Sequence, residues 1–443
     1  MTPLSGWLDG TRRTLRDVAS DRRMALMLVL GFGAGLPILL VFATLSAWLR
    51  SVGIARSEIG LLSYVSLAYS LKFLWAPVID RFDLPVLSRL LGRRRSWMLA
   101  SQLLVAGSLV AMSRGDPAQS LGYVVVCALL IAFASATQDI VVDGWRIDAA
   151  PTERQGMMLA AYQLGYALAR ICAGAGALYV ADAFSWAPAY GTMAALMLVA
   201  IVGTLAAPKV QARDPGQRRG WRAGLQEAVV EPFADLVRRK GAGLALILAL
   251  ITLYRLPDIV SGIMANPLYI DMKFTLSEIA TVSKVYGVWV GIAGAFAGGI
   301  AVSRLGMHLS LLIGGIAASA SNLMFAWLAL AGHDLPLLVA SISIDNFAGA
   351  FAGTALIAYM SGLTSPAFAA TQYALLSSLY ALPGKFVGGL TGFAVEAMGY
   401  PAFFVMTAMV GIPVVALCLA LRLLPGERDE VQDVAANGAV ARP

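Results

Sequence analysis

PKVQARDPGQRRGWRAGLQEAVVEPFADLVRRK, residues 208–240, is a polar stretch that separates two long apolar blocks of the chain. It carries eight lysine and arginine residues. The blocks on either side, 24–207 and 241–422, contain 184 and 182 residues. Because the blocks are so similar in length, we expect two equivalent halves joined by a basic linker that lies on the cytoplasmic surface of a membrane.

The composition identifies a membrane protein. Of the 443 residues, 59% are hydrophobic and only 13% are charged, and the mean hydropathy is +0.75. Soluble domains contain about 25% charged residues, so this chain has too few polar residues to cover a soluble body. The composition therefore excludes a soluble enzyme, a disordered chain and a nucleic-acid-binding protein.

A helix that spans a membrane needs about 20 apolar residues, and the chain contains twelve apolar runs of about this length. We therefore predict an all-α membrane protein with twelve transmembrane helices, six in each half. The runs lie at about 24–48, 59–79, 96–113, 119–141, 156–181, 187–207, 241–264, 277–299, 308–331, 336–361, 370–392 and 401–422.

The positions of the basic residues predict how the chain is oriented, because cytoplasmic loops carry an excess of lysine and arginine. Of the 33 basic residues, 24 lie before the first run, at the end of the twelfth run (Arg422) or after it, or between an even run and the odd run that follows it. The opposite loops hold only four: Arg50, Arg56, Arg114 and Lys273. We therefore expect the N-terminal segment 1–23 and the tail 423–443 to be cytoplasmic.

A short motif follows the second run and is weakly repeated after the eighth. The first copy is Pro77-Val78-Ile79-Asp80-Arg81-Phe82 followed by Gly92-Arg93-Arg94-Arg95, and the second is Gly298-Gly299-Ile300-Ala301-Val302-Ser303-Arg304-Leu305-Gly306. This motif resembles the loop signature of the major facilitator superfamily, and so does the layout of two six-helix halves. The resemblance implies a transporter whose halves rock about a site near the middle of the membrane.

We predict that the charged residues of this loop act in gating. Asp143, near the cytoplasmic end of the fourth run, is expected to pair with one of the loop arginines. The residues to which we assign gating are Asp80, Arg81, Arg93, Arg94 and Asp143, and Arg95 is a further possible partner of Asp143.

Away from the ends of the apolar runs lie eight ionisable residues. A charge there costs about 2.5–3.5 kcal/mol and therefore faces protein, water or ligand. Five are basic and three are acidic. A surplus of fixed positive charge in a cavity of low dielectric favours an anionic solute. We predict substrate binding by the five basic residues, Lys72, Arg170, Arg255, Lys284 and Lys385; the acidic residues are Asp139, Asp258 and Asp345.

Several of these charges have a simpler alternative explanation. Lys72 and Lys284 each lie seven residues from an end of their runs, so their long side chains can reach the membrane interface. Arg255 and Asp258 are three residues apart and can neutralise each other on one helix face.

Asp345 is our first candidate for proton coupling. No lysine or arginine lies within one turn of it on its own helix, and a low dielectric disfavours the charged form of an isolated carboxylate. Such a group can take up and release a proton. Asp139 and Asp258 are further candidates, and the alternative for Asp345 is a structural role beside Asn346.

Other features argue against further chemistry. The three cysteines, Cys127, Cys172 and Cys418, fall in apolar runs and predict neither a disulfide nor a metal site. No GxxxxGK[ST] loop is present, so ATP does not drive the protein directly. The GFGAG stretch at 31–35 predicts close helix packing, with a bend at Pro37. Because no set of residues suits catalysis, we expect neither an enzyme nor a cofactor, with a proton gradient as the driving force.

Longer strings resemble the AmpG-type muropeptide permeases of the same superfamily. In the first half these are GFGAGLP at 31–37, LKFLWAP at 71–77 and SATQDIVVD at 135–143. In the second half they are LYR at 253–255, Asp345-Asn346 and ATQYALLS at 370–377. The similarity extends from about residue 24 to residue 420.

This resemblance implies proton-driven import of anhydromuropeptides, which are anionic sugar–peptide fragments of the cell wall, across the bacterial inner membrane during peptidoglycan recycling. It adds Gln138 and Asn346 to the predicted substrate-binding residues. In relatives an arginine follows the pair Gly165-Tyr166, whereas this chain has Ala167 there and Arg170 one turn later.

Two alternatives to this function stay open. One is a carrier of another anionic solute, such as a siderophore or an acyl-CoA, on the same scaffold. The other is a membrane sensor that binds muropeptides without transporting them. In either case we expect the lipid bilayer, protons and the anionic ligand as partners, with no nucleic acid and no obligate protein partner.

Overall fold

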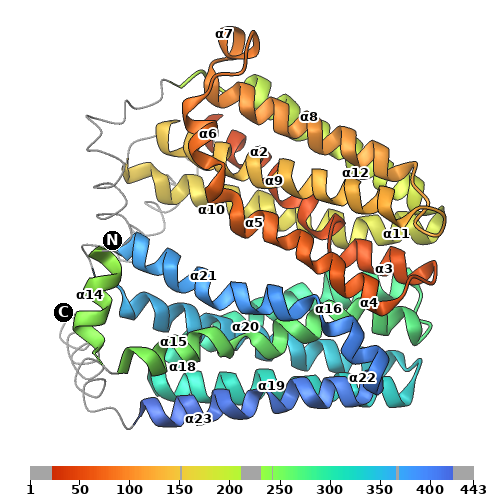
Figure 1. Ribbon diagram of the computed structural model, residues 1–443, viewed down its shortest axis with the longest axis vertical. Coiled ribbons are helices and arrows are strands. Elements are labelled where there is room, and N and C mark those ends of the chain that lie inside the picture. The colour runs from red at the N-terminus through yellow and green to blue at the C-terminus, as the bar shows by residue number, and fades with distance from the viewer. Residues whose placement is uncertain (1–21, 150–151, 211–230, 242, 366–368, 423–443) are drawn as a thin grey trace, which may run out of the picture. The chain divides into compact units, whose positions relative to one another are not determined.

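The computed structural model describes residues 22–149, 152–210, 231–241, 243–365 and 369–422, and all regular structure in these ranges is helical (Figure 1). Both predicted terminal segments lie almost wholly outside the described residues, as does most of the 208–240 linker. Among the described helices, ten segments are long and apolar enough to cross a membrane. They are Arg22–Ser51, Arg93–Ser113, Leu121–Arg146, Met158–Ala183, Trp186–Ala206, Gly243–Asp271, Leu276–Leu305, Met307–Ala331, Leu335–Leu363 and Thr391–Leu421.

The other two predicted runs are helical but less regular. The run at 370–392 forms most of α21 (Ala369–Gly388) and the start of α22 (Thr391–Met409). The run at 59–79 is divided among short pieces, because its 3-10 turns and a proline at the start of its last helix interrupt the α-helical hydrogen bonds. These pieces are α4 (Arg56–Leu62), η1 (Ser63–Ser66), α5 (Leu67–Leu71), η2 (Lys72–Leu74) and α6 (Ala76–Arg81).

The chain forms two compact units, Met1–Ile54 with Val65–Asp214, and Ala55–Tyr64 with Pro215–Pro443. The ten residues 55–64 lie within the predicted first half, yet they pack with the second unit. There α4 contacts α22 and α16 (Leu256–Asp271).

The first unit is a bundle in which α2 crosses α10 at very short range. A Cβ atom at Gly31 would lie 2.1 Å from the carbonyl oxygen of Tyr162, and one at Gly165 would lie 1.9 Å from that of Leu28. The predicted packing role of the first of these glycines is therefore confirmed. The helices of this unit are α2 (Arg22–Leu40), α3 (Ala43–Ser51), α5, α6, α7 (Leu87–Leu91), α8 (Arg93–Ser113), α9 (Leu121–Ala149), α10 (Thr152–Ile171), α11 (Ala177–Ala183) and α12 (Trp186–Ala206).

The second unit is built in a similar way, with α18 against α20. A Cβ atom at Gly294 would lie 2.3 Å from the carbonyl oxygen of Phe347, so only glycine permits this approach. The core of the unit gathers leucine, isoleucine and tyrosine side chains such as Leu250 and Tyr254. Its remaining helices are α14 (Glu231–Lys240), α15 (Gly243–Tyr254), α17 (Leu276–Ile279), α18 (Gly287–Leu305), α19 (Met307–Ala331), α20 (Leu335–Leu363) and α23 (Gly411–Leu421).

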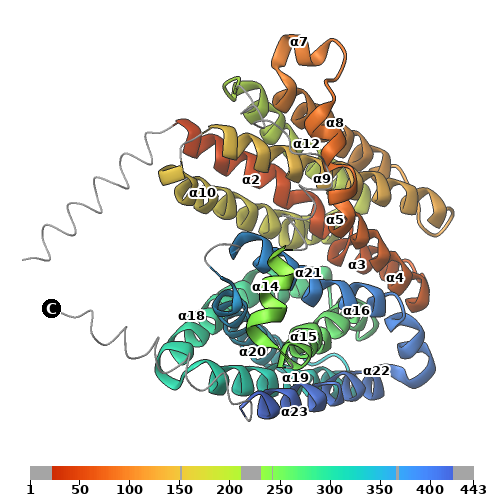
Figure 2. The same cartoon turned by 60° about the vertical axis from the view of Figure 1, so that its left-hand side comes forward.

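The described end of the linker is α14, which packs against α15 and α21 (Figure 2). Leu236 on its inner face is 3% exposed and joins the core of the second unit. Asp235 and Arg239 lie on the same side and bind Gln372 of α21. This end of the linker is therefore docked on the second unit by both apolar and polar contacts.

Candidate functional site

Some of the ionisable residues predicted inside the membrane form ion pairs, and we describe those of each unit separately. In the first unit, Lys72 on η2 lies beside Asp139 on α9, with Nζ 3.7 Å from Oδ2. The Asp139 side chain is 17% exposed, and its other oxygen, Oδ1, has no hydrogen-bond partner among the described residues. A nearly buried carboxylate is thus partly neutralised by a lysine. The alternative explanation, that Lys72 only extends its side chain to the membrane interface, is therefore incomplete, because its ammonium group has a carboxylate partner.

Gln138 lies next to Asp139 but is completely buried. Neither polar atom of its side chain has a hydrogen-bond partner in the described part of the chain. The amide is held close to α2, because a Cβ atom at Gly33 would lie 3.1 Å from Nε2. Since an unpaired buried amide costs about 1–3 kcal/mol, this position suits a group that exchanges partners during function.

The neighbouring Thr137 shows how α9 is joined to the second predicted run. Its hydroxyl accepts a hydrogen bond from Nε1 of Trp75 at 3.1 Å and donates to the carbonyl oxygen of Phe133. The Trp75 ring lies 4.8 Å from that of Phe133. The sequence analysis did not single out Trp75 or Tyr162, although both stand beside motif residues in space.

Arg170 is exposed and occupies the last turn of α10. The helix then changes to a π-helix, η3 (Cys172–Gly176). Lys284 in the second unit lies within another π-helix, η5 (Ala280–Tyr286). Because π-helical turns are rare and occur frequently at functional sites, they are a second reason, independent of charge, to place both residues in a binding region.

In the second unit Arg255 lies where α15 ends and α16 begins. Its Nη1 is 2.9 Å from Oδ2 of Asp258, and it also donates to the carbonyl oxygen of Gly349 on α20. The structure therefore shows the neutralised pair that was the simpler alternative for these two residues. Gly349 and Gly353 provide the space in which the guanidinium lies against α20.

Lys284 donates a hydrogen bond from Nζ to Oδ1 of Asn266 on α16, at 3.1 Å. Asn266 is 4% exposed, so it can fix the direction of the ammonium group. Asn346 lies against α18, where its Nδ2 would be 2.2 Å from a Cβ atom at Gly287. Lys385 lies on α21 and is partly exposed.

Asp345 points toward α19 and not along α20 to Asn346. Its Oδ1 lies 3.0 Å from the hydroxyl of Ser321. That hydroxyl is also 2.7 Å from the carbonyl oxygen of Ala318. Polar residues inside an apolar run, such as Ser321 and the fully buried Asn322, were the available sequence signal for this contact.

The predicted gating residues form different pairs from those expected. Asp143 is 3.5 Å from Arg146 on its own helix, and Arg94 is 3.2 Å from Asp148. The expected pairing of Asp143 with a loop arginine is therefore corrected, because a basic residue one turn along α9 is nearer. The side chains of Asp80 and Arg81 lie outside the described part of the structure, and Arg93 begins α8.

The chain matches known membrane transporters in both family and fold. Residues 24–386 match the Major Facilitator Superfamily, and the chain belongs to that family. Solved structures with the same fold include the nucleoside transporter NupG (15% identity, TM-score 0.65, covering 90% of this chain and 98% of that one). A POT family transporter has 11% identity and a TM-score of 0.67, covering 90% of this chain and 95% of that one. The predicted facilitator fold is thus confirmed.

More similar relatives are known from sequence. The chain is 37% identical over 402 residues to a protein of Escherichia coli (strain K12) named anhydromuropeptide permease, covering 90% of this chain and 80% of that protein. It is 34% identical over 407 residues to a Rickettsia conorii protein named putative transporter AmpG 4, covering 91% and 97%. These relatives confirm the resemblance found in the sequence and a multi-pass membrane transporter, not an enzyme.

Proposed function

We propose that the protein is a proton-coupled secondary transporter that imports anionic anhydromuropeptides by alternating access. The observation that carries the substrate class is the 37% identity, over 90% of the chain, to a protein named anhydromuropeptide permease. We further propose that the protein lies in the bacterial inner membrane with both termini in the cytoplasm, as its basic residues predict. The driving force is the proton gradient, without a cofactor.

The balance of the intramembrane charges supports an anionic substrate. Lys72 and Arg255 are matched by Asp139 and Asp258. The other intramembrane charges of the sequence are Arg170, Lys284, Lys385 and Asp345. Taken together, five cations face three carboxylates, and this surplus of positive charge suits the carboxylates of a sugar–peptide substrate.

The contact between Ser321 and Asp345 supports a proton site. A serine hydroxyl has one proton to donate. When this proton is donated to Oδ1 of Asp345 at 3.0 Å, it stabilises the carboxylate. When the hydroxyl instead donates to the Ala318 carbonyl at 2.7 Å, its oxygen is free to accept from a protonated carboxyl group. The site therefore accommodates the neutral acid, which is what a proton carrier requires in one of its states.

Uptake into proteoliposomes tests the proposed function. The vesicles contain the purified protein, an inward proton gradient is imposed, and accumulation of a radiolabelled anhydro-disaccharide tetrapeptide is measured with and without a protonophore. We expect accumulation that the protonophore abolishes, and competition by the unlabelled compound but not by its neutral sugar alone. Binding without accumulation would instead support a sensor. Absence of binding would contradict the proposal and direct attention to siderophores and acyl-CoA.

A further inference from the structure

A small basic pocket lies in the first unit, where helix α2 begins and helix α12 ends. Its volume is about 190 Å³, and it is lined by Arg22, Arg23, Leu26, Ala206 and Pro208. None of these described lining residues is acidic. The pocket therefore combines two guanidinium groups with an apolar wall, outside the set of intramembrane charges discussed above.

The pocket lies at the depth of the lipid headgroups. Arg22 is the first residue of the apolar span Arg22–Ser51, and Ala206 is the last residue of the span Trp186–Ala206. The polar interface of a bilayer starts where its hydrocarbon core ends, and both apolar helices end at this pocket. The basic residues of the sequence assign this end of both helices to the cytoplasmic side.

Two arginines bind the last turn of α12. Arg95 donates to the carbonyl oxygens of Thr204 and Leu205, at 3.1 and 2.6 Å. Arg22 donates to the carbonyl oxygen of Ala206 at 2.9 Å. Capping of the helix end therefore explains the position of Arg95. It explains Arg22 only in part, because a guanidinium has further N–H donors beyond the one bond that Arg22 makes within the described residues.

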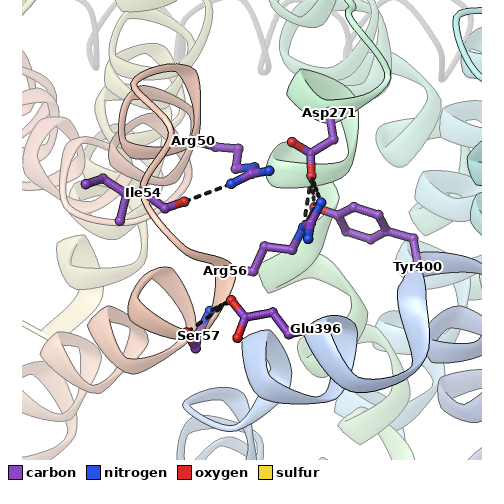
Figure 3. Close-up of polar contacts among 7 residues, drawn as sticks. All are labelled: Arg50, Ile54, Arg56, Ser57, Asp271, Glu396 and Tyr400. Atoms are coloured by element: carbon purple, nitrogen blue, oxygen red, sulfur yellow. Dashed lines mark hydrogen bonds and ion pairs between the residues drawn. The ribbon is translucent and has the colours of Figure 1, made fainter. Parts of the chain in front are cut away.

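Two arginines elsewhere show a different arrangement. Arg56 of α4 lies 2.7 Å from a carboxylate oxygen of Asp271 (Figure 3), and Arg94 lies 3.2 Å from Asp148. In the part of the chain that the structure describes, Arg22 bonds to a backbone carbonyl and has no carboxylate partner. Its positive charge therefore attracts an anion from outside the described residues.

An exposed apolar track runs from the pocket along α12. Val199 and Val202 lie seven and four residues before Ala206, so the three residues share one face of the helix. Both valines are exposed. Helix α2 packs beside this face, since a Cβ atom at Gly203 would lie 2.5 Å from Cγ1 of Val29. The track is therefore a surface on which an acyl chain can lie next to α2.

We propose that this pocket binds an anionic phospholipid, with its phosphate on Arg22 and Arg23 and an acyl chain along Val199 and Val202. Guanidinium groups bind phosphate through paired hydrogen bonds, and basic pockets between membrane helices on the cytoplasmic side suit anionic headgroups. The apolar track favours a lipid over a soluble phosphate, which has no chain to cover it. The bound lipid stabilises the contact of α2 with α12, whatever solute the protein transports.

Fluorescence quenching tests this site. In a variant whose three cysteines are replaced by alanine, Ala25→Cys carries a bimane group on an exposed position between the pocket residues Arg22 and Leu26. The protein is placed in phosphatidylcholine nanodiscs that contain a small share of doxyl-labelled lipid. We expect doxyl-phosphatidylglycerol to quench at least about twice as strongly as doxyl-phosphatidylcholine, and this preference to disappear in Arg22→Gln/Arg23→Gln. Equal quenching by the two lipids in the parent protein would overturn the proposal.

Two controls separate a specific site from general surface charge. Arg95→Gln removes an arginine that binds the same helix end without lining the pocket, and should retain the preference. A bimane at Phe184→Cys, an exposed position just before the opposite end of α12, should show no preference. A preference at residue 184, or its loss in Arg95→Gln, would contradict a specific site.

A soluble headgroup separates the lipid from a free phosphate. Glycerol 1-phosphate at millimolar concentration should leave the quenching by doxyl-phosphatidylglycerol unchanged, because it has no acyl chain. Loss of quenching would show that the pocket takes a soluble phosphate and would contradict the proposal. No muropeptide is used, so an absent lipid preference leaves the proposed function standing, and absent muropeptide uptake leaves the lipid site standing.

Discussion

The Arg255–Asp258 pair offers the sharpest test of the charge balance described above. Removing one partner of a fully buried ion pair costs about 3–5 kcal/mol, whereas exposed pairs contribute about 0.2–1 kcal/mol. The two side chains are 25% and 12% exposed, and the atoms are 2.9 Å apart. We therefore expect Asp258→Ala to destabilise the second unit by about 2 kcal/mol, between these limits.

The double variant Arg255→Ala/Asp258→Ala should be less destabilised than the two single variants together, because neither charge is left unmatched. For a folding unit of roughly 200 residues, 2 kcal/mol lowers the unfolding midpoint by about 4–8 °C. Thermal unfolding of the protein in nanodiscs, followed by tryptophan fluorescence, measures this change. The matched control is Asp143→Ala, which breaks a pair of the same spacing at 3.5 Å with the aspartate 50% exposed, and should shift the midpoint by less than about 2 °C. Additive single-variant effects would refute the coupling.

Three further predictions concern packing, proton coupling and the linker helix. Gly165→Ala should lower the unfolding midpoint and separate α2 from α10, because the new Cβ atom would lie 1.9 Å from a carbonyl oxygen. The control Gly107→Ala has open space around its Cβ position and should leave the midpoint unchanged in the same thermal assay. Asp345→Asn should abolish gradient-driven accumulation in proteoliposomes while retaining substrate binding; wild-type accumulation would exclude this residue as the proton carrier. The pKa of Asp235 is lowered first by the hydrogen bond from Gln372 and then by that from Arg239. The ionised carboxylate therefore stabilises the docking of α14 above the ordinary pKa of an aspartate, and this stabilisation is lost as the pH falls through the lowered pKa. Hydrogen exchange of α14, corrected for intrinsic rates, should therefore rise only at acidic pH, and Asp235→Asn should raise it at pH 7.

The sequence was most informative where a local property determines the structure. Ten of the twelve apolar runs correspond to helical segments long enough to span a membrane, because hydropathy depends on the residues of one segment alone. The close packing at Gly31 was also predictable, since only small residues allow helices to approach so closely. The family followed from strings such as SATQDIVVD at 135–143.

The pairing of charges was less accessible to sequence reasoning. The proximity of Arg255 and Asp258 was foreseen as an alternative because they are three residues apart on one helix. The predicted partner of Asp143 was wrong, because the carboxylate pairs with Arg146, three residues along its own helix, and not with an arginine of the loop. Ser321 and Asn266 were missed because a neutral polar residue within or beside an apolar run signals a polar contact without showing which residue it will contact.

The sequence alone therefore determined that this is a membrane transporter of two halves with an excess of positive charge inside the membrane, because composition, run length and charge position are properties of the chain itself. Only the tertiary structure decided which carboxylate neutralises which cation, where π-helical turns occur, and that residues 55–64 pack with the second unit. These features depend on contacts such as that of Arg56 with Asp271, 215 residues apart in the chain. Such contacts form only when distant helices meet, and no local pattern encodes which helices those will be.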